Sequence, residues 1–378
     1  MRKLITLVAG VVVVGAILGN AWATTPGFNN PDYTYTRVWS TTEEIGGTGV
    51  RWVAGAGSTL AWSDRGGNGY VADFNGVTGE LSNITQFASD NCYQVSLDAT
   101  GDNVTYVSFD ESNLTLTDGT TVVTGNVFKR YNIATTATTT AFSVSDLAPA
   151  NYEAATGYRG NDLGWYGSVY GSADTTVMSL RGHANGRWDL YSYTAGSNDL
   201  TRLTTSDEPS EYLPSIEGTD TDKILYWTEY QGSPSSAPRS VMVYDVSEGT
   251  EELVAAGSEV GETPYYGFLS CAWGKDDSIV LTSVTPVDWT KGDLWIYENV
   301  GGSWVKTDLT GDGHDFDSEG FCITGFMTDS GNVFFGGRHN SDADFRGIWF
   351  AQVPEPATMA LLGVGGLGVL VRRRRRKA

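Results

Sequence analysis

The sequence predicts an all-β chain that folds as a six-bladed β-propeller of four-stranded antiparallel blades. Turn-forming residues abound, with 47 glycines in 378 residues, and no stretch shows sustained helical periodicity. A short strand ending in an aromatic residue recurs six times, at positions 74, 131, 193, 244, 297 and 350. The spacings between these positions, 57, 62, 51, 53 and 53 residues, indicate one structural unit per repeat. The six aromatic strands are Gly69–Phe74, Val127–Tyr131, Asp189–Tyr193, Val241–Tyr244, Asp293–Tyr297 and Gly347–Phe350.

Each aromatic strand has a partner that precedes it in the chain and begins after a polar turn. Turns such as Thr100–Asp102 and Asp329–Gly331 are suited to hairpins. A further strand follows several units, as at Leu200–Thr204 and Glu252–Ala255, so the repeat supplies the four strands of a propeller blade. The preceding strands are Ser58–Trp62, Asn103–Tyr106, Thr175–Met178, Lys223–Tyr226, Ser278–Leu281 and Asn332–Phe335.

The last repeat ends near Ala351 with three strands, so the ring needs one strand from elsewhere to close. Tyr33–Trp39 lies before the first repeat and alternates as a strand does. We expect it to complete the last blade and to remove the open sheet edge. Seven short blades, or a β-sandwich, are the competing architectures.

The repeats resemble those of TolB-type propellers. The segment Asp189–Thr204 is the closest match, and Arg65, Arg181 and Arg338 lie where such repeats often place an arginine after the second strand. The resemblance implies a propeller fold, in a family that includes both binding scaffolds and enzymes.

The N-terminus has the three parts of a secretory signal peptide. Arg2 and Lys3 form a basic start, Leu4–Leu18 is a short apolar run, and Ala21-Trp22-Ala23 fits a signal peptidase site. We expect residues 1–23 to be removed and the mature chain to begin at residue 24. A retained membrane anchor is the alternative.

The C-terminus combines a Pro-Glu-Pro box, a short apolar helix and a basic cluster. An apolar segment, Ala357–Val371, follows the box; it is a marginal membrane span that the basic cluster would hold on the cytoplasmic side. This order resembles the PEP-CTERM sorting signal of Gram-negative bacteria, which implies recognition and cleavage by an exosortase. A plain tail anchor would leave the box unexplained. The expected domains are 1–23, 24–352 and 353–378. The sorting residues are Pro354, Glu355, Pro356, Arg372, Arg373, Arg374, Arg375 and Arg376.

The chain carries a net charge of −21, with 24 basic and 45 acidic residues. Removing both ends leaves 16 basic and 44 acidic residues, so the mature domain carries −28. This charge opposes nucleic acid and anionic lipid as partners. Only the terminal segments of the precursor are expected to contact the membrane.

The segment from residue 308 to residue 319 nearly fits an EF-type calcium loop. A glycine stands at the sharp turn, but a threonine takes the third place and Asp315 stands where an apolar residue is usual. The alternative is a solvated acidic connection between the fifth and sixth blades. Calcium is the one cofactor that the sequence suggests. The candidate ligands are Asp308, Thr310, Asp312, His314 and Glu319.

Three cysteines enter an oxidising compartment, which permits one disulfide. Cys271 and Cys322 precede the second strands of the fifth and sixth repeats by seven and ten residues, so both fall on innermost strands of neighbouring blades. We therefore predict a bridge between them and exclude Cys92, which lies in the second blade. Three buried thiols are the alternative.

The function that these features favour is that of an exported scaffold, on the cell surface or in the extracellular matrix, that binds polysaccharide or surface proteins. A polysaccharide-active enzyme, either a lyase or a glycoside hydrolase, is the alternative. The sequence has no nucleophile motif and no tight metal cluster, so it assigns no catalytic residue.

Overall fold

The computed structural model describes most of the chain between residues 28 and 353. The described residues are 28, 30–40, 49–89, 91–157, 170–171, 175–181, 188–204, 210–216, 223–229, 240–256, 267–274, 278–284, 293–310, 320–339 and 345–353. They form these strands and helices in chain order: β1 (Thr34–Trp39), β2 (Val50–Ala56), β3 (Thr59–Asp64), β4 (Gly69–Phe74), β5 (Leu81–Ala88), β6 (Cys92–Leu97), β7 (Asn103–Thr115), β8 (Val122–Asn132), β9 (Ala137–Phe142), the 3-10 helix η1 (Val144–Asp146), α2 (Pro149–Thr156), β10 (Tyr170–Gly171), β11 (Thr175–Arg181), β12 (Trp188–Thr194), β13 (Asp199–Arg202), β14 (Ser210–Ile216), β15 (Lys223–Glu229), β16 (Ser240–Asp245), β17 (Thr250–Ala255), β18 (Gly267–Trp273), β19 (Ile279–Val284), β20 (Leu294–Val300), β21 (Ser303–Asp308), β22 (Gly320–Met327), β23 (Val333–His339) and β24 (Gly347–Gln352).

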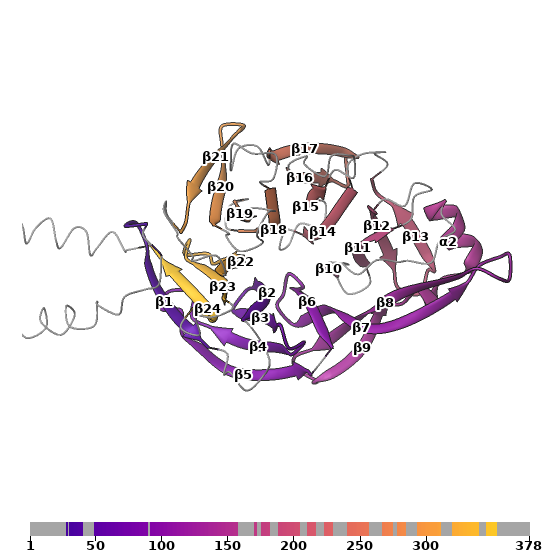
Figure 1. Ribbon diagram of the computed structural model, residues 1–378, viewed down its shortest axis with the longest axis horizontal. Helices are drawn as coiled ribbons and strands as arrows, with labels where there is room; N and C mark the ends of the chain where they lie inside the picture. The colour runs from indigo at the N-terminus through magenta and orange to yellow at the C-terminus, as the bar shows by residue number, and fades with distance from the viewer. Residues whose placement is uncertain are drawn as a thin grey trace, which may run out of the picture.

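The strands form a six-bladed β-propeller. Within the described residues there are six four-stranded sheets, and every strand pair in them is antiparallel. Blades 1 to 5 are β2–β5, β6–β9, β10–β13, β14–β17 and β18–β21. The innermost strands β2, β6, β10, β14, β18 and β22 contact one another in a closed ring (Figure 1). The predicted fold and blade number are confirmed, and the seven-bladed and sandwich alternatives are wrong.

Blade 6 is closed by the N-terminal strand, as predicted. Its strand order is β1-β24-β23-β22, with Thr34 paired to Gln352 and Arg37 paired to Trp349. A buried aromatic group holds the strand in place: Phe28 stacks on Tyr35 with ring centroids 4.8 Å apart and meets Trp349 edge-on at 5.2 Å. The closing strand is therefore fixed by aromatic packing as well as by its hydrogen bonds.

The core lies between neighbouring blades, where the recurring aromatic residues are buried. Phe74 of blade 1, for example, meets Phe334 of blade 6 at a centroid distance of 5.0 Å. Phe334 in turn packs against Phe350 at 4.7 Å. The repeat is visible in the sequence because each blade must present large apolar side chains to the next one.

Blade 2 departs from the simple repeat. Its central hairpin, β7 with β8, is longer than the sequence patterns indicate, and α2 follows the blade and packs near β13 (Figure 1). Tyr152 of α2 is fully buried in the same apolar cluster as Leu114, Leu116 and Val123 of the hairpin region. The all-β class is confirmed, and the short helices η1 and α2 are additions to it that lie within the 62-residue spacing between Tyr131 and Tyr193.

The helix α2 has local start and stop signals. Pro149 stands at its first turn, where no backbone donor is needed, and Gly157 ends it in a left-handed conformation with φ of 61°. Glu153 accepts hydrogen bonds from the backbone and hydroxyl of Thr117, each at 2.8 Å, and so ties the helix to the β7–β8 turn.

The predicted signal peptide, 1–23, lies outside the described residues, and so does the predicted sorting segment, 353–378, except for Val353. Within the part of the chain that the structure describes, no helix combines the length and apolar character needed to cross a membrane.

Candidate functional site

Three β-bulges meet at one edge of blades 1 and 2. Arg51 is the extra residue where β2 pairs with β3, and Tyr93 lies in the bulge where β6 pairs with β7. Phe109 and Asp110 form the bulge where β7 pairs with β8. A bulge turns a side chain away from the direction that regular pairing would give it, so bulges are common at sheet ends that carry a site.

Backbone hydrogen bonds hold this edge together. The amides of Asn91 and Cys92 both donate to the carbonyl of Gly67, at 2.9 and 2.7 Å, and so join the start of β6 to the β3–β4 turn. Ser63 of β3 donates its hydroxyl to the carbonyl of Tyr93 at 2.6 Å. The amide of Phe109 donates to the carbonyl of Asn91 at 3.3 Å. The two blades therefore form one continuous support for the side chains above them.

The bulged side chains and Arg65 form what we call the blade 1–2 cluster: Arg51, Arg65, Tyr93 and Phe109. The guanidinium of Arg51 lies over the Tyr93 ring at 4.3 Å and near the Phe109 ring at 5.9 Å. The two rings meet edge-on at 5.4 Å. All four side chains are partly exposed, so the cluster is accessible from solvent.

The charge of Arg51 acts on Arg65. Burial is the larger cause that lowers the pKa of Arg65 below its usual value, and the charge of Arg51 lowers it further, while Tyr93 partly opposes the shift. Among the described residues no carboxylate forms an ion pair with Arg51. Arg51 therefore lies within electrostatic range of Arg65.

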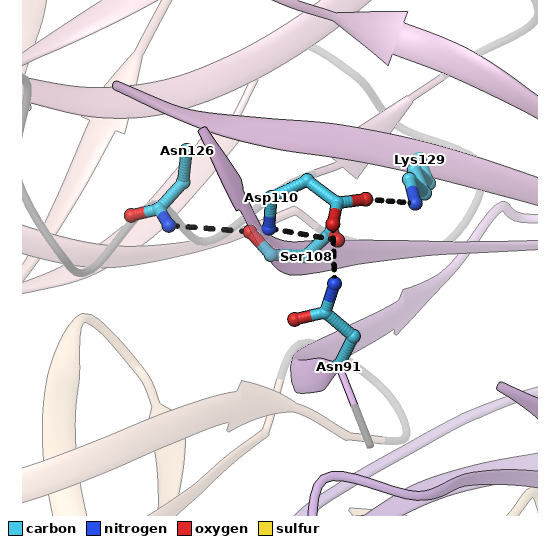
Figure 2. Close-up of polar contacts among 5 residues, drawn as sticks. All are labelled: Asn91, Ser108, Asp110, Asn126 and Lys129. Atoms are coloured by element: carbon cyan, nitrogen blue, oxygen red, sulfur yellow. Dashed lines mark hydrogen bonds and ion pairs between the residues drawn. The ribbon is translucent and has the colours of Figure 1, made fainter. Parts of the chain in front are cut away.

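Beside the cluster lies the Asp110 network, formed by Asn91, Ser108, Asp110, Asn126 and Lys129 (Figure 2). Asp110 accepts hydrogen bonds from Lys129 and from Asn91, the latter at 2.5 Å, and its backbone amide donates to Ser108 Oγ at 3.2 Å. The hydrogen bond from Lys129 is the main cause that lowers the pKa of Asp110. The Asp110 side chain is 45% exposed, so this charged and amide-rich group is open to solvent.

A buried polar group at the β3–β4 turn, formed by Asp64 and Asn68, stabilises the same edge. Asp64, 2% exposed, accepts hydrogen bonds from the backbone and side-chain amides of Asn68, each at 2.9 Å. Burial, and then the nearby Asp64 carboxylate, raise the pKa of Tyr70 to about 12. Asp64 thus fixes the β3–β4 turn that carries Arg65.

A cavity of about 410 Å³ lies between blades 5 and 6, near Val353, where the chain leaves the propeller. Tyr33, Ile296, Glu298, Met327 and Val353 are among the residues that line it. Burial is the main cause that raises the pKa of Tyr33, followed by the charges of Glu298 and Asp32. Polar and apolar groups contribute to its lining in similar measure, and Glu298 makes one side of it acidic.

Two of the five candidate calcium ligands lie in the described residues. Thr310 is fully buried, and its hydroxyl accepts the backbone amide of Leu294 at 3.2 Å. Blade 3 repeats this contact, because Thr204 accepts the amide of Leu190 at 3.1 Å. The threonine thus has a role in the blade repeat that needs no cation.

Asp308 also has a local role, since its carboxylate accepts the Thr310 amide at 3.0 Å. Asp312, His314 and Glu319 lie outside the described residues. In the described part of the chain no group of three His, Cys, Asp or Glu side chains is placed to hold a metal. The calcium site stays a prediction.

The cysteines of the predicted bridge lie on neighbouring strands of the inner ring, Cys271 on β18 and Cys322 on β22. Cys271 is a buried free thiol whose pKa is raised by burial, and so is Cys92, on β6. The side chain of Cys322 lies outside the described residues, so the bridge stays a prediction.

The sequence patterns did not single out the blade 1–2 cluster. Arg65 stood out only as a repeat position, and Arg51, Tyr93 and Phe109 not at all. The signal available in the sequence was the irregular alternation around Val50–Trp52 and Cys92–Val95, where β-bulges interrupt the strand period.

Comparison with protein families finds one match. Residues 352–376 match the model of the PEP-CTERM protein-sorting motif. The chain therefore carries at its C-terminus a motif that implies sorting by an exosortase, and with it export and cell-surface sorting in bacteria. A comparison with curated proteins finds no match.

Several solved structures are similar to this chain. A putative TolB from Agrobacterium tumefaciens is 13% identical over 77% of this chain and 90% of its own, with a TM-score of 0.47. Hydrazine synthase from Kuenenia stuttgartiensis is 14% identical over 78% and 74%, with a TM-score of 0.45. The Cps50 (Swd1) β-propeller domain of Myceliophteria thermophila is 10% identical over 81% and 84%, with a TM-score of 0.44.

Proposed function

We propose that this chain is an exported binding protein, displayed on the outer surface or in the extracellular matrix of a Gram-negative bacterium. Signal peptidase removes residues 1–23, the propeller of residues 24–352 is the mature binding domain, and an exosortase processes residues 353–378. The PEP-CTERM motif carries this proposal, because a motif of this kind directs a protein to the cell surface.

The position of the motif supports the same order of domains. It begins at Gln352, the last residue of β24, so the sorting segment follows the final strand of the propeller directly. The propeller is complete at that point, since β1 has already paired with β24. Removal of the segment after residue 353 leaves every strand of blade 6 in place.

The blade 1–2 cluster supports binding as the function of the propeller. It offers a cation, aromatic rings and exposed polar groups on a rigid edge, as ligand sites commonly do. The net charge of −21 opposes nucleic acid as the partner. We propose extracellular polysaccharide or other surface proteins as its partners.

Expression in a host that has an exosortase tests the proposal. Mass spectrometry of surface-exposed protein should find a start near Thr24 and no residues from Ala357 onward. The double variant Pro354→Ala, Pro356→Ala should stay in the cell membrane fraction, whereas Pro149→Ala, outside the motif, should be sorted normally. Surface material that retains Arg372–Arg376 would contradict the proposal.

The enzymatic alternative is tested with the same protein. Incubation of the full chain with acidic and neutral polysaccharides should release no new reducing or unsaturated ends. Sustained release of such ends would favour a lyase or a glycoside hydrolase over a scaffold.

A further inference from the structure

We propose that, before processing, the end of the propeller from which the sorting segment leaves is held next to the membrane, and that the blade 1–2 cluster is turned away from it. This inference rests on the proposed function and on the sequence expectation that Ala357–Val371 enters the membrane before an exosortase acts. It gives the domain an orientation, with one end of the ring facing a lipid bilayer and the other end free for binding.

The chain leaves the propeller through what we call the exit clasp, formed by Gly76, Val77, Asn332, Gln352 and Val353. Asn332, which is 4% exposed, accepts the backbone amide of Val353 at 2.9 Å and donates its side-chain amide to the carbonyl of Gly76 at 2.8 Å. Gln352 donates its side-chain amide to the carbonyl of Val77 at 2.9 Å. Gly76 and Val77 belong to the loop between β4 and β5. The end of β24 is therefore tied to blade 1 as well as to its own blade.

Little chain separates the exit clasp from the segment expected in the membrane. Only Pro354, Glu355 and Pro356 stand between Val353 and Ala357. Even when fully extended, this stretch spans at most about 14 Å. Each proline also fixes its own φ and restricts the residue before it, so the stretch has little freedom to bend back. While the apolar segment is in the membrane, the exit clasp must lie within about 14 Å of the start of that segment.

The directions of the strands place the blade 1–2 cluster at the other end of the ring. In blade 1, β2 runs from Arg51 near one end to the β2–β3 turn after Ala56 at the other. The loop of the exit clasp follows β4 at the same end as this turn, because Thr59 pairs with Asp73. In blade 2, Tyr93 likewise lies at the end of β6 that is away from the β6–β7 turn. Strand β2 has seven residues and is about 23 Å long, so roughly the thickness of the ring separates the cluster from the exit clasp.

The turns at the exit end of blades 6, 1 and 2 form one face of the ring. A Cβ atom at Gly101, in the β6–β7 turn, would lie 2.8 Å from the carbonyl oxygen of Ala56, so the turns of blades 1 and 2 are in contact. The exit clasp joins blade 1 to blade 6 at the same end. Exposed carboxylates on this face, at Glu80, Asp102 and Asp329, do not favour adsorption to anionic lipid. The short tether, and not an affinity for lipid, therefore orients the ring.

Energy transfer from the protein to a lipid bilayer tests the orientation. The full chain is added from detergent to preformed vesicles of phosphatidylethanolamine and phosphatidylglycerol that carry an acceptor dye, and flotation selects the bound chains. A donor dye is attached at Val77→Cys, in the exit clasp, or at Val122→Cys, at the opposite end of β8; the two valines are 46% and 41% exposed. Strand β8 reaches the exit end at Asn132, which pairs with Asn103, so Val122 lies roughly 30 Å from that end. We expect transfer from position 77 to be about twofold greater or more.

Variants of the full chain test whether the short tether is the cause. An insertion of about 20 glycine and serine residues between Val353 and Pro354 would span about 25 Å on average, so the difference between the two positions should largely disappear. Asn332→Ala removes two hydrogen bonds of the exit clasp and should narrow the difference. Asn113→Ala, at an exposed asparagine on β7, is the matched control and should not change it. Melting temperature shows whether each variant folds, and the chain without an added cysteine gives the background labelling of the native cysteines.

Equal transfer from positions 77 and 122 would overturn the inference, and so would a difference that persists unchanged in the variant with the inserted linker. Chains that do not float with the vesicles would overturn it as well, because no membrane tether would exist. None of these results concerns cleavage by an exosortase, which mass spectrometry of surface-exposed protein decides separately. Failure of that cleavage, with the expected transfer still observed, would refute the proposed function and leave the orientation in place.

Discussion

The closing strand of blade 6 depends on the absence of a side chain at Gly347, and this dependence can be tested by Gly347→Ala. Gly347 has φ of +147°, which L-residues rarely adopt. A Cβ atom at this position would lie 1.9 Å from the carbonyl oxygen of Trp39, at the end of β1. Strand β1 would have to move away from β24 to make room.

Two contributions set the size of the effect. Holding a non-glycine residue at such a φ costs about 1–3 kcal/mol. Relieving the contact with Trp39 adds a cost like that of overpacking, about 1–3 kcal/mol. We therefore expect Gly347→Ala to lower the free energy of unfolding by about 2–6 kcal/mol. Gly249→Ala is the control: φ is +65° and nothing lies within 4 Å of a Cβ, so only backbone strain of about 1 kcal/mol applies.

Urea unfolding followed by tryptophan fluorescence measures the difference in stability between the two variants. Hydrogen exchange gives the local result: amides of β1 should exchange faster in Gly347→Ala, while those of β7 and β8 should not change. If the two variants have equal stability within about 0.5 kcal/mol, and β1 exchanges at the wild-type rate, the described closure of the ring is wrong.

Three further predictions concern the calcium loop, the cysteines and pH. Millimolar calcium should raise the melting temperature of the full chain, and Asp312→Ala should abolish the rise; an unchanged melting temperature in calorimetry would mean a solvated loop. Non-reducing peptide mapping should find Cys271 linked to Cys322, and two free thiols there would refute the bridge. The pKa of Tyr70 is raised to about 12 by burial and by Asp64, above its usual value of about 10, so stability should be full below pH 10 and fall as pH rises towards 12. Tyr70→Phe should reduce that fall in alkaline unfolding curves, and an identical pH profile would contradict the raised value.

The fold could be predicted because propeller blades repeat their burial pattern. Phe74, Tyr297 and Phe350 are buried on the corresponding strands of their blades, β4, β20 and β24, so their spacing in the sequence records the blade length. The spare strand was predictable from the need to close blade 6. The helix α2 was not, because one helix of eight residues that buries mainly Tyr152 leaves a weak pattern.

The candidate site was less predictable than the fold. A bulge changes which face a residue occupies by adding one residue to one strand, and composition does not reveal it. Arg51 and Tyr93 are separated by an entire blade in the sequence, and their contact depends on two such insertions. The sorting signal was predictable for the opposite reason, since all its parts are contiguous.

Because Thr34 pairs with Gln352, the ring can close only after the chain has been synthesised as far as β24. Nearly the whole chain must emerge before its first strand finds its partner, which gives the closing contact a very high sequence separation and a slow formation step. A chain that stops early leaves the edge of β23 or β22 open to other chains. Because the sorting motif begins at the residue that completes the ring, a chain that carries the motif has also passed the point at which it can close.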